Sequence, residues 1–386
     1  MKTPLKDGMI SRLLNAVTLL LASSICVGQP PSFQGLGDLP GGDSHGAAFD
    51  VSADGSVVVG YGTSASGREP FRWTRSGGMI GLGDLPGGGH LGFAYGVSAD
   101  GSAVVGHSWS GQSGGLLEAF RWTGQTGMLG LGDLPQAGIG SEGHGVSADG
   151  SVVAGHGNDS EHKQAYVWTQ KDGMVGLGFL PGGTESRAYD VSADGSGIVG
   201  ASSSSSVEYV EAFRWTAQTG MVGLGELPGG YESSEAFGVS ADGATVVGAS
   251  WSASGYEAFR WTEAGGMLGL GDLPGGAFHS WALDVSGDGS AIVGYGTTGT
   301  GEAALIWSLE QGVRDLHDVL TTDCGLDLTG WTLRKANAIS DDGTTIVGFG
   351  YNANNGNQEA FVAVLPEPAA LALLALGGLA LLRRRR

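Results

Sequence analysis

The side chains best suited to chemistry in this sequence are histidines, tryptophans and charged groups in the irregular stretches between repeated segments. Aromatic rings beside polar groups on an exposed face suit glycan or protein recognition. Loops that are merely solvated and carry no function are the alternative. The candidate binding face consists of His45, His90, Trp109, His144, Glu185, Arg187, Trp251, His279 and Trp281, together with Tyr209, Tyr231 and Tyr256.

Two patterns resemble metal sites. The four histidines of the candidate face suggest a ring of ligands, but they belong to different repeats and have no close-spaced partner, so we expect no metal and no cofactor. The run Asp50-x-Ser52-x-Asp54-Gly55 has calcium-loop spacing, but Tyr61 stands where the loop needs a glutamate. Asp-Gly between apolar runs favours a tight hairpin instead, and calcium stays as the alternative.

Motifs for nucleotide-dependent or zinc-protease catalysis are absent: the sequence has no P-loop and no H-E-x-x-H. A non-enzymatic role is favoured, although repeats can assemble carboxylates from distant segments. The formal net charge is −20, and a nucleic-acid partner is excluded because an acidic surface repels phosphates.

One unit of about 45 residues occurs seven times. Its marker is Val/Ile-Ser-x-Asp-Gly, followed by a β-branched run, an aromatic segment such as Glu118-Ala-Phe-Arg-Trp-Thr, and Gly-Leu-Gly-Asp-Leu-Pro. Short β-branched or aromatic pieces bounded by glycine read as four strands, here A to D. The markers lie at 51–55, 97–101, 146–150, 191–195, 239–243, 285–289 and 339–343.

Seven four-stranded units predict an all-β, seven-bladed β-propeller over residues 33–365. The repeat begins with a lone D strand near Phe33 to Leu39 and ends with a C strand near Glu359 to Val364, so these two fragments complete one blade and close the ring. A β-solenoid is the alternative. The recurrent tryptophans of strand C alternate with arginines, which favours packing between blades over sugar platforms. Residues 315–335 form an insertion that carries Cys324 and Trp331.

The units resemble the HAF family of extracellular repeats at the segments Glu-Ala-Phe-Arg-Trp and Gly-Leu-Gly-Asp-Leu-Pro-Gly-Gly. Glutamate replaces the family's histidine, as in Glu118 and Glu211. The resemblance covers residues 33–365 and implies an extracellular setting without a characterised activity.

Both ends of the chain have the features of targeting signals. Residues 1–28 have a basic start, a short apolar run and small residues, which predict a secretory signal peptide and leave Cys324 as a lone thiol. Residues 366–386 resemble the PEP-CTERM sorting signal of Gram-negative bacteria. That resemblance implies processing by an exosortase and transient insertion in the inner membrane. Its motif residues are Pro366, Glu367, Pro368, Arg383, Arg384, Arg385 and Arg386.

The sequence therefore predicts an exported binding or structural protein of the cell surface or extracellular matrix. Exopolysaccharide or another envelope component is the expected partner. The alternative is a secreted propeller hydrolase or lyase that acts on polysaccharide.

Overall fold

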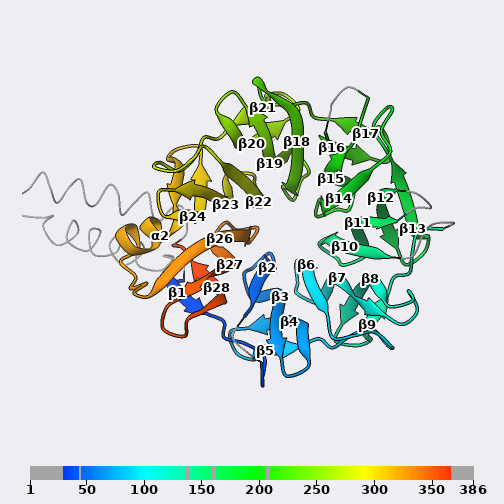
Figure 1. Ribbon diagram of the computed structural model, residues 1–386, viewed down its shortest axis with the longest axis horizontal. Helices are drawn as coiled ribbons and strands as arrows, with labels where there is room; N and C mark the ends of the chain where they lie inside the picture. The colour runs from blue at the N-terminus through cyan, green and yellow to red at the C-terminus, as the bar shows by residue number, and fades with distance from the viewer. Residues whose placement is uncertain (1–28, 43–44, 136–139, 159–161, 206–208, 367–386) are drawn as a thin grey trace, which may run out of the picture. The chain divides into compact units, whose positions relative to one another are not determined.

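The computed structural model describes residues 29–42, 45–135, 140–158, 162–205 and 209–366. Seven antiparallel sheets of four strands each surround a common axis (Figure 1), and Pro31–Leu365 form one compact unit. The protein is a seven-bladed β-propeller, as the repeat predicts.

Each blade runs from strand A beside the axis to strand D at the outer wall. Blade 1 contains β2 (Ala47–Val51), β3 (Val57–Ser64), β4 (Gly67–Thr74) and β5 (Gly78–Gly81). Blade 2 contains β6 (Gly92–Val97), β7 (Ala103–Ser110), β8 (Leu116–Thr123) and β9 (Gly127–Gly130). Blade 3 contains β10 (Ser141–Val146), β11 (Val152–Asn158), β12 (Lys163–Thr169) and β13 (Gly173–Gly178).

The remaining blades follow the same order. Blade 4 contains β14 (Ser186–Val191), β15 (Gly197–Ser202), β16 (Glu211–Thr216) and β17 (Gly220–Gly223). Blade 5 contains β18 (Gly229–Val239), β19 (Thr245–Ser252), β20 (Gly255–Thr262) and β21 (Gly266–Gly269). Blade 6 contains β22 (Ser280–Val285), β23 (Ala291–Thr298), β24 (Gly301–Ser308) and β25 (Gly312–Asp315). Blade 7 contains β26 (Trp331–Ile339), β27 (Thr345–Asn352), β28 (Asn357–Val364) and β1 (Ser32–Gly35).

The repeated Ser-x-Asp-Gly forms the turn between strands A and B. In blade 1, the hydroxyl of Ser52 donates to Asp54 and accepts the backbone N–H of Val57 at 2.9 Å. Gly55 has φ +71°, a left-handed conformation that glycine adopts without a Cβ clash. The carboxylate of Asp54 also accepts the N–H of Ser56. The carboxylate of Asp54 therefore finds its hydrogen-bond donors within the turn, in agreement with the hairpin interpretation.

The ring is closed by the first strand of the propeller. β1 pairs antiparallel with β28, with Ser32 opposite Val364. Where the two ends of the propeller meet in blade 7, a hydrogen bond of the other blades is also present. Gly37 N–H donates to Glu359 at 3.1 Å, and the equivalent bond in blade 2 runs from Gly132 N–H to Glu118 at 3.2 Å. The predicted closure of blade 7 by an N-terminal strand is confirmed, although the strand ends at Gly35 rather than near Leu39.

The hydrophobic core lies between neighbouring blades. Phe120 of β8 is fully buried and belongs to a cluster that also contains Val57 and Val59 of blade 1. The arginines of strand C reach the blade on the other side, because Arg121 of blade 2 donates to the carbonyl of Gly150 in blade 3 at 2.8 Å. Trp122 packs against this cluster. These contacts support the packing interpretation of the recurrent Trp and Arg.

The predicted insertion at 315–335 is shorter than expected. It folds as α2 (Leu316–Asp318) and the helical turn η1 (Val319–Asp323), whose Leu316 and Leu320 are fully buried against blades 6 and 7. Trp331 begins β26, so the last residues of the predicted insertion belong to strand A of blade 7. Cys324 is partly buried, and burial raises the pKa of its thiol, which makes it less reactive.

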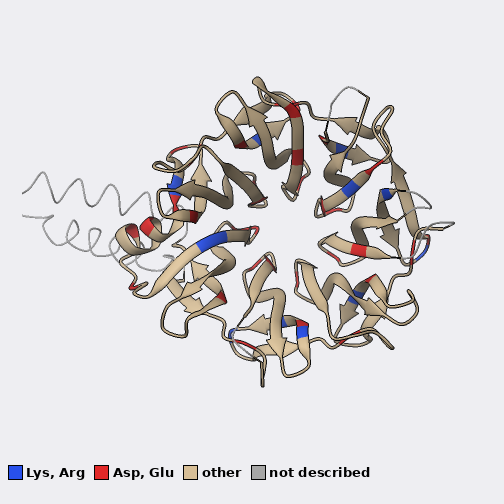
Figure 2. Cartoon of the chain, in the orientation of Figure 1, with Lys and Arg blue, Asp and Glu red and all other residues tan. Residues whose placement is uncertain are grey.

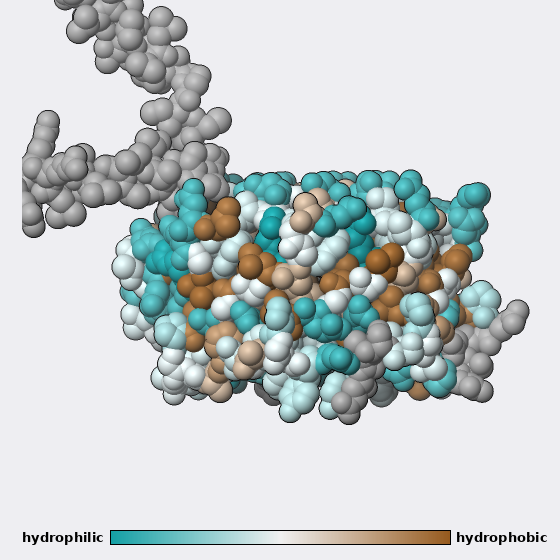
Figure 3. All heavy atoms as spheres, turned by 90° about the horizontal axis from the view of Figure 1, so that it is seen from above, coloured by the Kyte–Doolittle hydropathy of each residue, from teal (hydrophilic) through white to brown (hydrophobic). Residues whose placement is uncertain are grey.

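Seen edge-on, the propeller wall carries hydrophobic residues at mid-height between hydrophilic rims (Figure 3). The predicted signal peptide and all of the sorting tail except Pro366 lie outside the described residues. Within the described part of the chain, no helix has the length and apolar character needed to cross a membrane.

Candidate functional site

The structure places most of the candidate binding face in strands rather than in loops. His45, His90, Glu185 and His279 precede strand A of their blades, as predicted. Tyr209 precedes β16, also outside a strand. The others lie within strands: His144 on β10, Arg187 on β14, Trp281 on β22, Trp109 on β7, Trp251 on β19, Tyr231 on β18 and Tyr256 on β20. Loops were predicted because these segments vary between repeats, but a strand can vary on the face that looks away from the core.

Six of these twelve residues share one end of the propeller, beside the axis. They lie just before or within strand A, six, four or two residues before the valine of the Val-Ser marker, namely His45, Glu185, His279, Arg187, Trp281 and His144. Among the strands beside the axis, Figure 2 shows acidic segments on β10 and β18 and basic segments on β14 and β26. Since the sheet scaffold repeats while these positions differ, this end of the axis is the candidate functional face.

Blades 5 and 6 carry a cluster of aromatic side chains on this face, the aromatic patch, defined as Tyr231, Trp251, Tyr256, His279 and Trp281. Tyr231 is 65 % exposed and meets the edge of Trp251 at 5.4 Å between ring centroids. Trp251 contacts Tyr256 at 5.4 Å, and Tyr256 contacts Trp281 at 4.7 Å. The Trp281 indole donates to His279 Nε2 at 3.2 Å. The rings of the patch form a continuous run of contacts in which Tyr256 is buried and the other members are exposed or partly exposed, and the run ends at a polar imidazole.

The aromatic patch continues around the axis into the other blades. Trp281 stacks on Phe237 at 5.4 Å, and Phe237 contacts Tyr189 at 5.4 Å. Tyr189 meets His144 at 5.7 Å, which in turn lies 5.0 Å from Tyr95. Rings from blades 2 to 6 therefore line one end of the axis and connect the aromatic patch to a second cluster.

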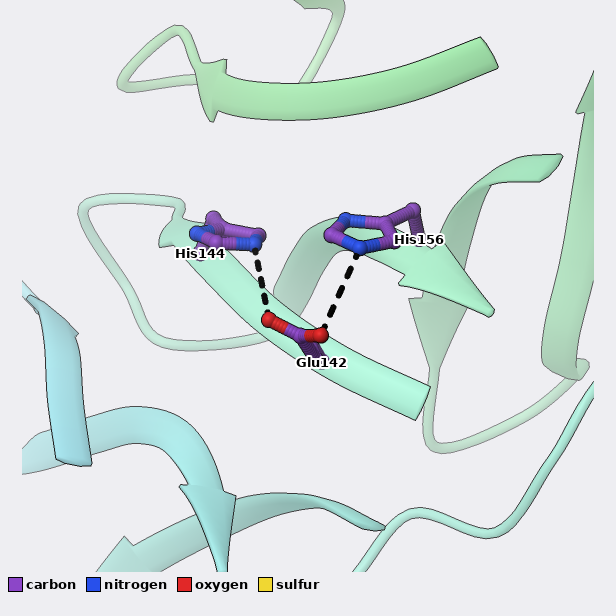
Figure 4. A group of neighbouring side chains, drawn as sticks. All are labelled: Glu142, His144 and His156. Atoms are coloured by element: carbon purple, nitrogen blue, oxygen red, sulfur yellow. Dashed lines mark ion pairs between the residues drawn. The ribbon is translucent and has the colours of Figure 1, made fainter. Parts of the chain in front are cut away.

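The second cluster is the His–Glu cluster, defined as Glu142, His144, His156 and His107 (Figure 4 draws the first three). Glu142 and His144 lie two residues apart on β10, and His156 is directly opposite Glu142 on β11. All three side chains therefore share one face of the sheet. Ligand-type atoms of these three residues lie within 4.8 Å of one another.

The fourth member comes from the neighbouring blade. His107 of β7 places Nδ1 3.4 Å from Glu142 Oε2, while His144 Nε2 and His156 Nε2 lie 3.9 and 3.6 Å from the same carboxylate. His107 and His156 are almost fully buried. Imidazole and carboxylate are the side chains that hold divalent transition metals, and this is the one such group of three or more found among the described residues.

The protonation states suit a polar cluster in a poorly hydrated site. Burial lowers the pKa of His107 to about 4 and that of His144 to about 3. Burial alone would raise the pKa of the Glu142 carboxyl, but the imidazoles of His156, His107 and His144 outweigh it and lower that pKa to about 2. Near pH 7, His107 and His144 are therefore neutral and Glu142 is ionised.

A pocket of about 150 Å³ adjoins the cluster between blades 2 and 3. Its walls include Glu142 and His156 from the cluster, the apolar Leu116 and Leu117, and the cationic Lys163. The pocket gives a small molecule or ion access to two members of the cluster.

Sequence reasoning named His144 but missed Glu142, His156 and His107. His107 and His156 each follow the glycine of a strand-B run, at the position held by Tyr61 or Tyr295 in other blades, so the repeat alone does not single them out. A comparison of the seven units position by position contains the missing signal, because only unit 3 combines Glu, His and His at the three facing positions.

No protein-family model matches the chain, and no curated protein matches it. Among solved structures, an oligogalacturonate lyase in complex with manganese is 14% identical with a TM-score of 0.54, and covers 88% of this chain and 98% of its own. An oligogalacturonate lyase from Vibrio parahaemolyticus is 10% identical, with a TM-score of 0.53 and coverage of 88% and 99%. TolB from Acinetobacter baumannii is 12% identical with a TM-score of 0.45, and covers 81% and 73%. At these identities the likeness to the two lyases shows a shared fold.

Proposed function

We propose that this chain is an exported, non-enzymatic binding or structural protein of the cell surface or extracellular matrix, and that it binds exopolysaccharide through the aromatic patch. One observation carries the proposal: Tyr231, Trp251, Tyr256 and Trp281 form an unbroken run of rings from an exposed tyrosine to the axis. Aromatic faces beside hydrogen-bonding groups combine apolar contact with polar specificity, which sugar rings require. Export is supported by the predicted signal peptide and the PEP-CTERM-like tail.

The repeated polar residues support a binding role over a catalytic one. The strand-C glutamates, which stand where HAF repeats have histidine, accept backbone N–H groups from the connection that follows, as Glu211 does from Gly225 at 3.2 Å and Glu257 from Gly271 at 3.0 Å. These carboxylates serve the scaffold. The polar residues that differ between blades lie at the candidate functional face and are the ones available to bind a ligand.

A matched pair of tryptophans tests the proposal. Trp251 and Trp109 occupy the same Ser-Trp-Ser position of units 5 and 2, but only Trp251 makes ring contacts among the described residues. We expect Trp251→Ala to weaken binding to the best ligand of a glycan array by about 10-fold or more, as loss of an aromatic anchor does. Trp109→Ala, which removes a side chain that is 41% exposed, should leave binding unchanged. Equal losses in both variants, or no glycan bound by the wild type, would reject the aromatic patch as the site.

A second candidate is a secreted polysaccharide lyase or hydrolase. It is favoured by the pocket, which brings the cation of Lys163 beside the carboxylate of Glu142 and the imidazole of His156. Two proteins of similar fold are oligogalacturonate lyases. Release of unsaturated or reducing ends from acidic polysaccharides, abolished by Glu142→Gln, would establish this activity and displace the binding proposal.

A further inference from the structure

We propose that Glu142, His144 and His156, with His107 as fourth ligand, bind one divalent transition-metal ion, Zn²⁺ foremost. This site is separate from the aromatic patch, because its residues come from blades 2 and 3 whereas the patch belongs to blades 5 and 6. The two proposals can therefore succeed or fail independently.

The donor set fits this class of ion. Zinc takes imidazole nitrogen and carboxylate oxygen at about 2.1 Å, in sites with four ligands, or with three protein ligands and an open position. Three imidazoles and one carboxylate supply four ligands, and the separations of 3.4, 3.6 and 3.9 Å from the Glu142 oxygens need only small side-chain rotations to surround one ion. Calcium and magnesium are disfavoured because they prefer oxygen ligands.

The ligand atoms are also left without ordinary partners. His107 Nδ1, His144 Nε2 and His156 Nε2 are buried and accept or donate no hydrogen bond among the described residues. Burial of an unsatisfied polar atom costs about 1–3 kcal/mol, and native proteins seldom leave several together. A bound cation would satisfy these lone pairs and the charge of Glu142 together.

The surroundings hold the ligands in place. Tyr95 packs its ring against His107 at 5.3 Å and against His144 at 5.0 Å. The Tyr166 hydroxyl donates to the backbone carbonyl of Glu142 at 3.1 Å. Aromatic walls that limit water and hydrogen bonds that fix a ligand strand are features that strengthen metal sites.

The residues of the His–Glu cluster also differ from those at the equivalent positions of other units. The positions of Glu142, His144 and His156 in unit 3 are held by Ala47, Phe49 and Tyr61 in unit 1, and by Arg187, Tyr189 and Ala201 in unit 4. The same blade therefore forms without these groups. Polar, buried residues that the scaffold does not need are best explained by a ligand.

The test is metal binding by full-length protein purified without a polyhistidine tag and stripped with a chelator. We expect calorimetry to give one Zn²⁺ per chain, and Co²⁺ to give a visible d–d absorption band that Zn²⁺ abolishes. His156→Ala and Glu142→Gln should each weaken the affinity by at least about 100-fold. Absence of saturable binding by the wild type would overturn the proposal.

A matched control is His90→Ala. His90 also pairs with a carboxylate, since its Nδ1 lies 2.8 Å from Asp84, but it is exposed and has no second histidine ligand. We expect its affinity for Zn²⁺ to equal that of the wild type, and an equal loss in this variant would overturn the site. Glu142→Gln keeps the size of the side chain, so it separates loss of a ligand from misfolding of His156→Ala. The Co²⁺ spectrum of the wild type tests imidazole ligation without any substitution.

Discussion

Three aspartates that are mostly enclosed by the protein, Asp50, Asp190 and Asp284, stand directly before the valine of the Val-Ser marker, and we expect their titration to affect stability. Asp190 accepts the backbone N–H groups of Val191 and of Val239 in the next blade, and Asp284 bridges blades 6 and 7 in the same way, as Asp50 bridges blades 1 and 2. Both oxygens of each carboxyl group are occupied by the protein. This use of the leading aspartate explains why the calcium-like spacing at Asp50 is a structural feature.

Burial, and then the charge of Asp284, raise the pKa of Asp190 to about 8 in the folded protein. A raised carboxyl pKa means that the folded state binds the proton more tightly than the unfolded chain, whose pKa is about 3.9. The stability from this group is therefore complete below pH 4 and is lost as pH rises toward 8. We expect the free energy of unfolding to fall less steeply between pH 5 and 8 in Asp190→Asn than in the wild type, measured by urea denaturation.

Asp242→Asn is the control for that prediction, because it removes the same charge from an exposed turn. The backbone N–H of Ala244, followed by the Ser240 hydroxyl, lowers the pKa of Asp242, so its titration lies below this pH range. Its slope should match that of the wild type. Identical slopes in all three proteins would contradict the assignment to Asp190.

At the scale of elements, we expect the short strand β1 to contribute strongly to the stability of the propeller, because it closes the ring. Phe33 of β1 packs edge-on against Trp331 of β26, at 5.0 Å between ring centroids, and its ring lies 5.6 Å from that of Phe361 on β28, so it ties β1 to strands A and C of blade 7. We expect Phe33→Ala to lower the free energy of unfolding by about 3 kcal/mol, the usual cost of truncating a packed phenylalanine. Chemical denaturation followed by tryptophan fluorescence measures it. Phe278→Ala, at an exposed loop position, should cost far less, and equal losses would argue against closure by β1.

The sequence predicted the strands well because their signals are local: β-branched runs, Asp-Gly turns and the phase of the repeat all lie within one unit. It predicted less of the site, because ligands meet through pairing and through neighbouring blades. The opposition of Glu142 to His156 depends on a register with a shift between Gly143 and Gly145. The approach of His107 depends on packing between blades 2 and 3. Neither is encoded by spacing along the chain.

At the scale of the whole molecule, the predicted tail should decide where the propeller is found. We expect Pro366→Ala combined with Glu367→Ala to retain the protein in the inner-membrane fraction of a Gram-negative host that has an exosortase, because the processing motif is lost while the apolar run and arginines persist. Immunoblots of cell fractions measure this. The control, Glu263→Ala with Pro274→Ala, alters an exposed glutamate and an exposed proline of the propeller and should reach the surface normally. The same distribution in both would refute the sorting role.

The turns between strands A and B are joined to one another by backbone hydrogen bonds around the propeller axis. Six backbone hydrogen bonds of 2.9 to 3.2 Å run from each turn to the next, beginning with Ala53 N–H to the carbonyl of Ala99 and ending with Gly287 N–H to that of Asp341. Main-chain atoms make this chain of bonds, so among substitutions only one to proline removes a donor. The bonds lie after the last residue of strand A, whereas Glu142 and Trp281 lie near the start of theirs. Sequence drift at the candidate functional face can therefore proceed blade by blade, and new specificities can arise there, while the base of the ring stays joined.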